Sequence, residues 1–194
     1  QMFNAIDSVP LTAIAFFMLT GELMTSATIT DRLVALSRAL IGRIRGGLAQ
    51  VNVLVSMFFA GMNGSVVADT ATVGALVLPA MKKAGYPAAF SAAVTGVSST
   101  IGGIIPPSIM MIVLANSTEI SIAALFAAGI VPGVLIGITI MIINHYFAIK
   151  YNFERSDEPF SIRRAGKELY RSSFALLIPL VLVGSVMGGV ASVV

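Results

Sequence analysis

The sequence predicts an all-α integral membrane protein that contains a re-entrant helical hairpin and a broken helix. Three observations predict this class. First, the chain has 194 residues, of which 57% are hydrophobic and 11% charged, a composition typical of proteins whose apolar surface faces a bilayer. Second, its long apolar segments alternate with short clusters of basic residues. Third, two of these segments are interrupted by glycine, proline and small polar residues.

The composition also argues against several classes of function. The chain has no Cys and one His, so thiolate chemistry and a His-based metal site are poor hypotheses. It contains no G-x-x-x-x-G-K-[ST] motif and thus no P-loop for ATP. An intramembrane protease would need a second carboxylate, or a His beside Ser65, at the depth of Asp69. We therefore expect a protein that is not an enzyme and does not bind nucleic acid.

The positions of the basic residues predict the direction in which each apolar segment enters or crosses the bilayer. A helix needs about 20 residues to cross the hydrocarbon core, and loops rich in Lys and Arg lie on the cytoplasmic side. All 12 basic residues become cytoplasmic if residues 46–81 enter from the cytoplasm and return to it. The predicted elements are a span over 9–29, an interfacial helix over 32–45, a re-entrant hairpin over 46–81, a broken helix over 87–115, a span over 122–149, a cytoplasmic loop over 150–171 and a span over 174–194.

Two cytoplasmic segments carry most of the charge. In residues 32–45, Leu33, Leu36, Leu40 and Ile44 share one helical face with arginines on its flanks, which predicts a helix in the membrane interface. A solvated linker helix is the alternative. The mixed charges of residues 150–171 predict a solvated connector.

The hairpin carries its polar residues near its middle, in the run GMNGSVVADTATVG at 61–74. Asn63, Gly64 and Ser65 suit a turn, so we expect the tip of the hairpin there. Irregular backbone at membrane depth is tolerated only where it is buried in protein or lines a wet cavity. Asp69 follows the turn, and an intramembrane carboxylate is costly and usually functional. The alternatives are that Asp69 caps a helix and that Asn63 and Ser65 serve the turn alone.

The next segment is interrupted in a similar way. Gly102–Gly103 and Pro106–Pro107 are unlikely within a straight helix. We predict a half-helix over 87–100, an unwound crossing over 101–107 and a second half-helix from 108. The glycine pair is expected to let this crossing approach the hairpin tip. Ser98, Ser99 and Thr100 either face that tip or bond back to carbonyls of their own helix.

Two interrupted elements at matching depth are typical of the binding site of a secondary transporter. Their hydroxyl, carbonyl and carboxylate oxygens suit a hard monovalent cation. An ion channel that uses the re-entrant loop as its filter is the alternative from these residues.

Three motifs in order resemble one known family. They are G-x-x-GS-x-x-AD-x-A-x-x-G-x-x-x-x-P-x-M-x-x-x-GY at 61–86, IIPPS at 104–108 and LFAAGIVPG at 125–133. Together they resemble the large permease subunit of tripartite ATP-independent periplasmic (TRAP) transporters. The resemblance implies sodium-driven import of organic anions, typically carboxylates or sialic acids, through the bacterial inner membrane. It also implies a small membrane subunit, a periplasmic substrate-binding protein and an elevator mechanism with two inverted repeats.

The oxygen donors of the two interrupted elements, together with the sodium coupling that the resemblance implies, predict roles for particular residues of this chain. We expect Na⁺ to be bound by Ser65, Asp69, Ser99 and Gly103. We expect the site to be lined by Asn63, Gly64, Ser98, Thr100, Pro106 and Pro107. The family's large subunit is longer, so the chain is expected to be an N-terminal-half fragment with one inverted repeat and the first span of the second. The substrate cannot be predicted, because no Lys or Arg is expected inside the membrane.

Overall fold

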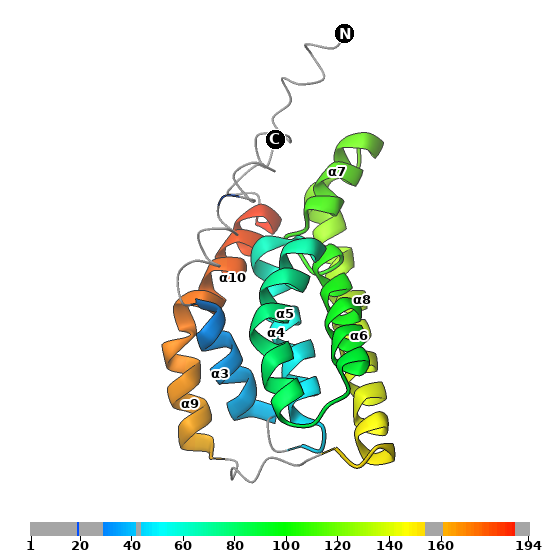
Figure 1. The fold of residues 1–194 in the computed structure, drawn as a ribbon. Helices are drawn as coiled ribbons and strands as arrows, with labels where there is room; N and C mark the ends of the chain where they lie inside the picture. The colour runs from blue at the N-terminus through cyan, green and yellow to red at the C-terminus, as the bar shows by residue number, and fades with distance from the viewer. Residues whose placement is uncertain (1–18, 20–28, 42–43, 154–160, 189–194) are drawn as a thin grey trace.

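The described part of the chain is a bundle of helices (Figure 1). The computed structural model describes residues 19, 29–41, 44–153 and 161–188. The predicted span over 9–29 therefore lies almost entirely outside the described residues. The elements are α3 (Ile29–Ile41), α4 (Gly47–Asn63), α5 (Val66–Lys83), α6 (Ala88–Ser99), the 3₁₀ turn η1 (Thr100–Gly103), α7 (Ile109–Thr118), α8 (Ile122–Lys150), α9 (Ile162–Arg171) and α10 (Ser173–Met187).

Helices α4 and α5 form an antiparallel pair joined by two residues, Gly64 and Ser65 (Figure 1). Helix α4 ends where Gly64 takes a left-handed conformation with φ 58°, and the Gly64 amide donates to the Ala60 carbonyl at 3.3 Å. Helix α5 begins at its N-cap Ser65, whose Oγ accepts from the Ala68 amide at 3.3 Å. Of the three turn residues suggested by the sequence, Asn63 is therefore the last residue of α4, and Gly64 and Ser65 join the two helices within 46–81.

The second interrupted segment changes direction between α6 and α7. Helix α6 passes into η1, and an irregular stretch over 104–108 then leads to α7. Ser108 holds this stretch together, because its hydroxyl donates to the Gly103 carbonyl at 2.9 Å and also accepts from the Met111 amide at 3.4 Å. Helix α7 continues to Thr118, beyond the predicted end at 115.

The hairpin tip contacts this irregular stretch backbone to backbone. The Ile109 amide donates to the Gly64 carbonyl at 3.4 Å. A Cβ atom on Gly64 would overlap the Pro107 carbonyl oxygen and lie 2.9 Å from the Ser108 Cα. A Cβ on Gly102, by contrast, would lie 3.7 Å from its nearest neighbour at Ser65, an ordinary contact. The close approach therefore depends on Gly64, whereas the sequence pattern pointed to Gly102 and Gly103.

Helix α8 supports both the hairpin and the crossing. It has 29 residues and is, within the described ranges, the one helix long and apolar enough to cross a membrane. Gly129, Gly133 and Gly137 are spaced four residues apart on it and form a glycine groove. A Cβ at the first of these positions would meet Ile104 and Met111, at the second Ile105, and at the third Met57 of α4.

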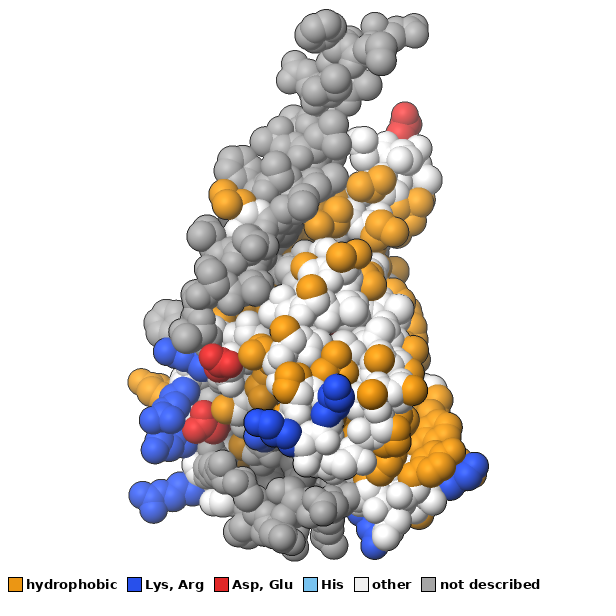
Figure 2. Space-filling model, viewed as in Figure 1, with side chains coloured by type: hydrophobic (Ala, Val, Ile, Leu, Met, Phe, Trp, Pro, Cys, Tyr) orange, Lys and Arg blue, Asp and Glu red, His pale blue; other side chains and the backbone are white. Residues whose placement is uncertain are grey.

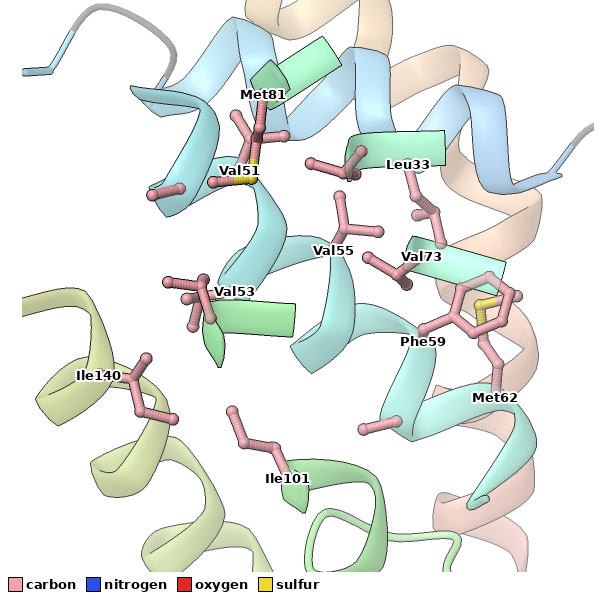
Figure 3. Close-up of a cluster of buried hydrophobic side chains, with 14 of the residues drawn as sticks. Leu33, Val51, Val53, Val55, Phe59, Met62, Val73, Met81, Ile101 and Ile140 are labelled. Carbon is pink, nitrogen blue, oxygen red and sulfur yellow. The ribbon is translucent and has the colours of Figure 1, made fainter. Parts of the chain in front are cut away.

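The main hydrophobic core lies around α4 (Figure 3). Phe59 of α4 is 1% exposed, and Val73 of α5, Ile101 of η1 and Leu33 of α3 are fully buried. Ile140 brings α8 into the same cluster. Burial of side chains of this size stabilises a fold by about 1.5–3 kcal/mol each in water, although in a bilayer their packing contributes more than their removal from solvent.

Helix α3 packs against α4 and α9. Leu33 and Leu36 are fully buried, whereas Leu40 is 42% and Ile44 41% exposed. We predicted an interfacial helix from this apolar face. Neighbouring helices cover its first half, and its second half is exposed.

Part of the predicted loop over 150–171 is helical, although most described residues of this helix are exposed, so the segment differs from the prediction in its secondary structure and not in its exposure to solvent. Helix α9 forms against α3, where Arg32 donates to the Arg171 carbonyl at 3.1 Å and the Ser172 hydroxyl donates to the Arg32 carbonyl at 3.2 Å. The high charge of the segment obscured its helical periodicity. Helix α10 covers the first part of the predicted span over 174–194, and residues 189–194 lie outside the described ranges.

The basic side chains visible in Figure 2 gather over one half of the molecule. Lys82 and Lys83 end α5, and Lys150 ends α8. Aromatic rings lie beside Lys150: its Nζ is 5.7 Å from the centroid of the Tyr151 ring, and that ring is 6.0 Å from Phe153. Phe153 in turn lies 4.6 Å from Tyr86 and 5.1 Å from Phe90. Lys residues beside aromatic rings are typical of a membrane–water interface.

The positions of these charges generate a test of topology. In a cysteine-free background of the full-length protein, Arg38→Cys and Lys83→Cys should both react with an impermeant thiol reagent applied from the cytoplasmic side. Both side chains are exposed and flank the hairpin. Thr118→Cys, at the exposed end of α7, should react only from the other side. Labelling of Arg38→Cys and Lys83→Cys from opposite sides would exclude a re-entrant hairpin.

The tip contact generates a test of stability. Gly64→Ala should lower the free energy of unfolding by at least about 2 kcal/mol, because a left-handed Ala and an overlap with backbone are both unfavourable. Gly103→Ala is the matched control, since its Cβ would lie 3.5 Å from Val66 Cγ2, and it should change stability by less than about 1 kcal/mol. Thermal unfolding in detergent measures both variants. Equal stability of the two would contradict the proposed role of Gly64.

Candidate functional site

Helix α4 carries two polar side chains on a face that is fully buried against α6. Asn52 and Ser56 are both 0% exposed. Asn52 Nδ2 donates to Thr95 Oγ1 at 2.7 Å. Ser56 Oγ and Ser98 Oγ lie 3.2 Å apart, and either can be the donor. These contacts join the first helix of the hairpin to the helix that precedes the break.

The hydroxyl groups of α6 also bond back to their own helix. Ser98 and Ser99 reach the Thr95 carbonyl at 3.1 and 2.8 Å, and Thr100 donates to the Val97 carbonyl at 2.7 Å. The back-bonding alternative considered for this run is therefore observed at all three positions. Ser98 contacts α4 as well, whereas Thr100 is exposed. The structure does not bring Thr100 into the buried cluster.

Asp69 lies where α4, α5 and α6 meet. Its side chain is 0% exposed, and both carboxylate oxygens are buried without a hydrogen-bond partner. The hydroxyls of Ser99 and Ser56 are its polar neighbours but do not reach hydrogen-bond geometry with it. Asp69 is not the N-cap of α5, because Ser65 occupies that position, but it lies in the first turn of this helix, so a stabilising interaction with the helix dipole remains compatible with its position.

An unpaired buried carboxylate is energetically costly, so it needs either a proton or a cation. Asp69 is in the first turn of α5, where the helix dipole favours a negative charge, whereas Lys82 and Lys83 are in the last turn of the same helix. The polar atoms around it are oxygens, which are the ligands of hard cations. Among the described residues, no three His, Cys, Asp or Glu side chains form a group that could hold a metal ion. One carboxylate with hydroxyl oxygens fits a monovalent cation better than a divalent one.

The other predicted site residues lie at the tip contact. Asn63 is 6% exposed, its Oδ1 accepts from the Ser65 amide at 3.1 Å, and its Nδ2 has no partner. Gly64 lies against Pro107, and Pro106 and Pro107 are buried and joined by a cis peptide bond. The Gly103 carbonyl accepts from the Ser108 hydroxyl. Apart from the exposed Thr100, the predicted residues thus divide between the surroundings of Asp69 and the tip contact.

Sequence reasoning missed Asn52, Ser56 and Thr95. Asn52 and Ser56 are spaced four residues apart in an otherwise apolar helix, a spacing that places both on one face. Ser91 and Thr95 repeat the spacing on α6. The four-residue spacing of these polar pairs is the sequence feature from which the buried cluster could have been predicted.

Comparison with known proteins gives a consistent result over the whole chain. The family model described as "Tripartite ATP-independent periplasmic transporter, DctM component" matches residues 1–193. The sialic acid TRAP transporter permease protein SiaT of Haemophilus influenzae is 39% identical over 99% of this chain and 31% of its own length. The C4-dicarboxylate TRAP transporter large permease protein DctM of Pseudomonas aeruginosa is 36% identical over 97% of this chain and 44% of its own length.

A third relative is the 2,3-diketo-L-gulonate TRAP transporter large permease protein YiaN of Escherichia coli, which is 37% identical over 97% of this chain and 44% of its own length. The chain therefore spans less than half the length of these relatives. The match confirms the resemblance found in the motifs at 61–86, 104–108 and 125–133. The chain belongs to the DctM family, the large permease component of tripartite ATP-independent periplasmic transporters.

Proposed function

We propose that the chain is part of the permease subunit of a sodium-coupled secondary transporter that imports organic anions. The observation that carries the proposal is the carboxylate of Asp69, which is fully buried with both oxygens unpaired between the hairpin and the helix before the break. A bound Na⁺ would neutralise this charge and would be coordinated by oxygens. Asp69, Ser99 and Ser56 are the residues best placed to hold it.

Coupling between sodium binding and substrate binding would follow from the contact between the hairpin tip and the break that precedes α7. Ser65 begins the helix that carries Asp69, and Gly64 lies against the first turn of α7. A cation at Asp69 would favour the packing of α5 against α6 and thereby order the tip residues Asn63, Gly64 and Ser65. If the substrate binds to the ordered tip, its affinity should increase when sodium is bound. This follows because two ligands that stabilise the same state of a protein strengthen each other's binding.

The substrate class comes from the relatives. Their names specify sialic acid, C4-dicarboxylates and 2,3-diketo-L-gulonate, all of which carry a carboxylate. We infer a carboxylate substrate for this protein too, received from a periplasmic binding protein. A small membrane subunit would complete the transporter, and the residues of this chain that would line the path are Asn63, Gly64, Ser65, Ser98, Gly103, Pro106 and Pro107.

The surface of the molecule supports a place in the bacterial inner membrane. Large apolar side chains are exposed along α7 and α8, including Met110 at 67%, Val131 at 64% and Ile142 at 64%. In water such a surface would favour aggregation; in a bilayer it would face lipid or other transmembrane helices. We also propose that the hairpin is re-entrant and that it moves as part of an elevator mechanism.

Asp69→Asn tests the proposal directly. The change keeps the side-chain shape but removes the charge, so it should raise the sodium concentration for half-maximal uptake by about tenfold or more, as expected for losing a charged ligand. The amount of folded protein should stay within about twofold, since neutralising an unpaired buried charge does not destabilise. Uptake of a radiolabelled carboxylate into proteoliposomes measures the first quantity.

Glu119→Gln is the matched control, because it neutralises an exposed carboxylate at the end of α7, and it should leave sodium dependence unchanged. If Asp69→Asn retains the parent's sodium dependence and rate, the cation site lies elsewhere. Uptake that does not saturate and needs no sodium gradient would favour a pore over a carrier.

A further inference from the structure

The hydroxyl group of Ser98 lies between Asn52 and Ser56 and has a choice of acceptors. Its Oγ lies 3.4 Å from Asn52 Oδ1, 3.1 Å from the Thr95 carbonyl and 3.2 Å from Ser56 Oγ. A serine hydroxyl has one hydrogen, so only one of these groups can receive it at a time. Ser98 is also 0% exposed, so bulk water does not compete for that hydrogen.

The surrounding groups fix the orientation of the Asn52 amide. Thr95 Oγ1 donates its hydrogen to the Ser91 carbonyl at 3.0 Å, so it accepts at its other contact, from Asn52 Nδ2 at 2.7 Å. Asn52 Nδ2 also lies 3.7 Å from Met81 Sδ, a weak acceptor. The carbonyl end of Asn52 therefore faces Ser98 and is available as an acceptor.

Two arrangements of hydrogens are compatible with these positions. When Ser98 donates to Asn52 or to the Thr95 carbonyl, Ser56 can donate to Ser98, and the lone pairs of Ser56 remain available on the side of Asp69. When Ser98 instead donates to Ser56, the hydrogen of Ser56 is free to turn toward the Asp69 carboxylate. The first arrangement makes Ser56 a cation ligand, and the second makes it a donor to an anion.

We propose that Ser98 is a positioning residue that sets the hydrogen of Ser56. Ser56 thereby switches between a ligand of a cation at Asp69 and, after a rotation of its side chain that brings it within hydrogen-bond reach, a donor to the empty carboxylate. The inference rests on the proposed sodium site and deepens it. Ser98 need not touch the ion, since it acts through Ser56. Asn52 supplies the acceptor that makes the ligand arrangement available.

The relay predicts a specific effect of removing one hydroxyl. In Ser98→Ala, Ser56 loses its acceptor on α6, so its hydrogen turns to Asp69 and opposes the cation. The sodium concentration that gives half of the maximal thermal stabilisation should rise by about fivefold, the effect of one net hydrogen bond. The measurement is the melting temperature of the purified full-length permease titrated with NaCl at constant ionic strength in KCl, which does not depend on transport.

A double-mutant cycle separates the relay from a general loss of packing. Ser56→Ala removes the proposed ligand, and Ser98→Ala should have no further effect in its presence, because its only route to the ion is through Ser56. Ser91→Ala is the matched control: Ser91 is a buried serine of the same helix, and its hydroxyl donates to the Pro87 carbonyl. It should leave the sodium midpoint unchanged.

Each other outcome overturns the relay. An unchanged midpoint in Ser98→Ala, additive effects of the two serine changes, or an equal shift in Ser91→Ala would each contradict it and would leave the sodium site itself intact. Absence of sodium stabilisation in the parent protein would instead refute the proposed sodium site, and the relay with it.

Discussion

The contact of the hairpin tip with the break is the constraint on which the rest of this structure depends. Gly64 and the stretch from Pro107 to Ile109 approach backbone to backbone, a distance that side chains normally prevent. This approach fixes how far α4 and α5 extend toward α7, and so fixes the level at which α5 begins. Asp69 lies one turn after that beginning, so the tip contact also determines which residues of α6 it faces.

The buried polar cluster is the second consequence of that placement. Apolar packing alone tolerates alternative arrangements, since hydrophobic cores lose uniqueness of structure before they lose stability. Hydrogen bonds between Asn52, Thr95, Ser98 and Ser56 add direction, because each is lost if α6 rotates against α4. Leaving such groups unpaired is costly in a low-dielectric interior. The cluster thus selects one register for the helices that surround Asp69.

The sequence predicts some of these features well because their physical cause is local. The turn at Asn63–Ser65 follows from residues that suit a turn, and the break follows from Gly–Gly and Pro–Pro, which disfavour a helix wherever they occur. The roles of Gly64 and Ser56 could not be predicted in the same way, since each depends on a partner from another helix. Helix α9 was missed because its packing surface against α3 is narrow and its composition resembles that of a solvated loop.

The glycine groove on α8 has a mechanical consequence. Glycines four residues apart advance about 40° around a helix at each step, so the groove runs obliquely across α8. The crossing occupies it at Ile104 and Ile105, and Met57 of α4 occupies its next turn. Protein interiors are close-packed, so a side chain that is displaced must move its neighbours. A slide of the crossing along the groove would therefore push on Met57 and would transmit motion from the crossing to α4 through apolar contact.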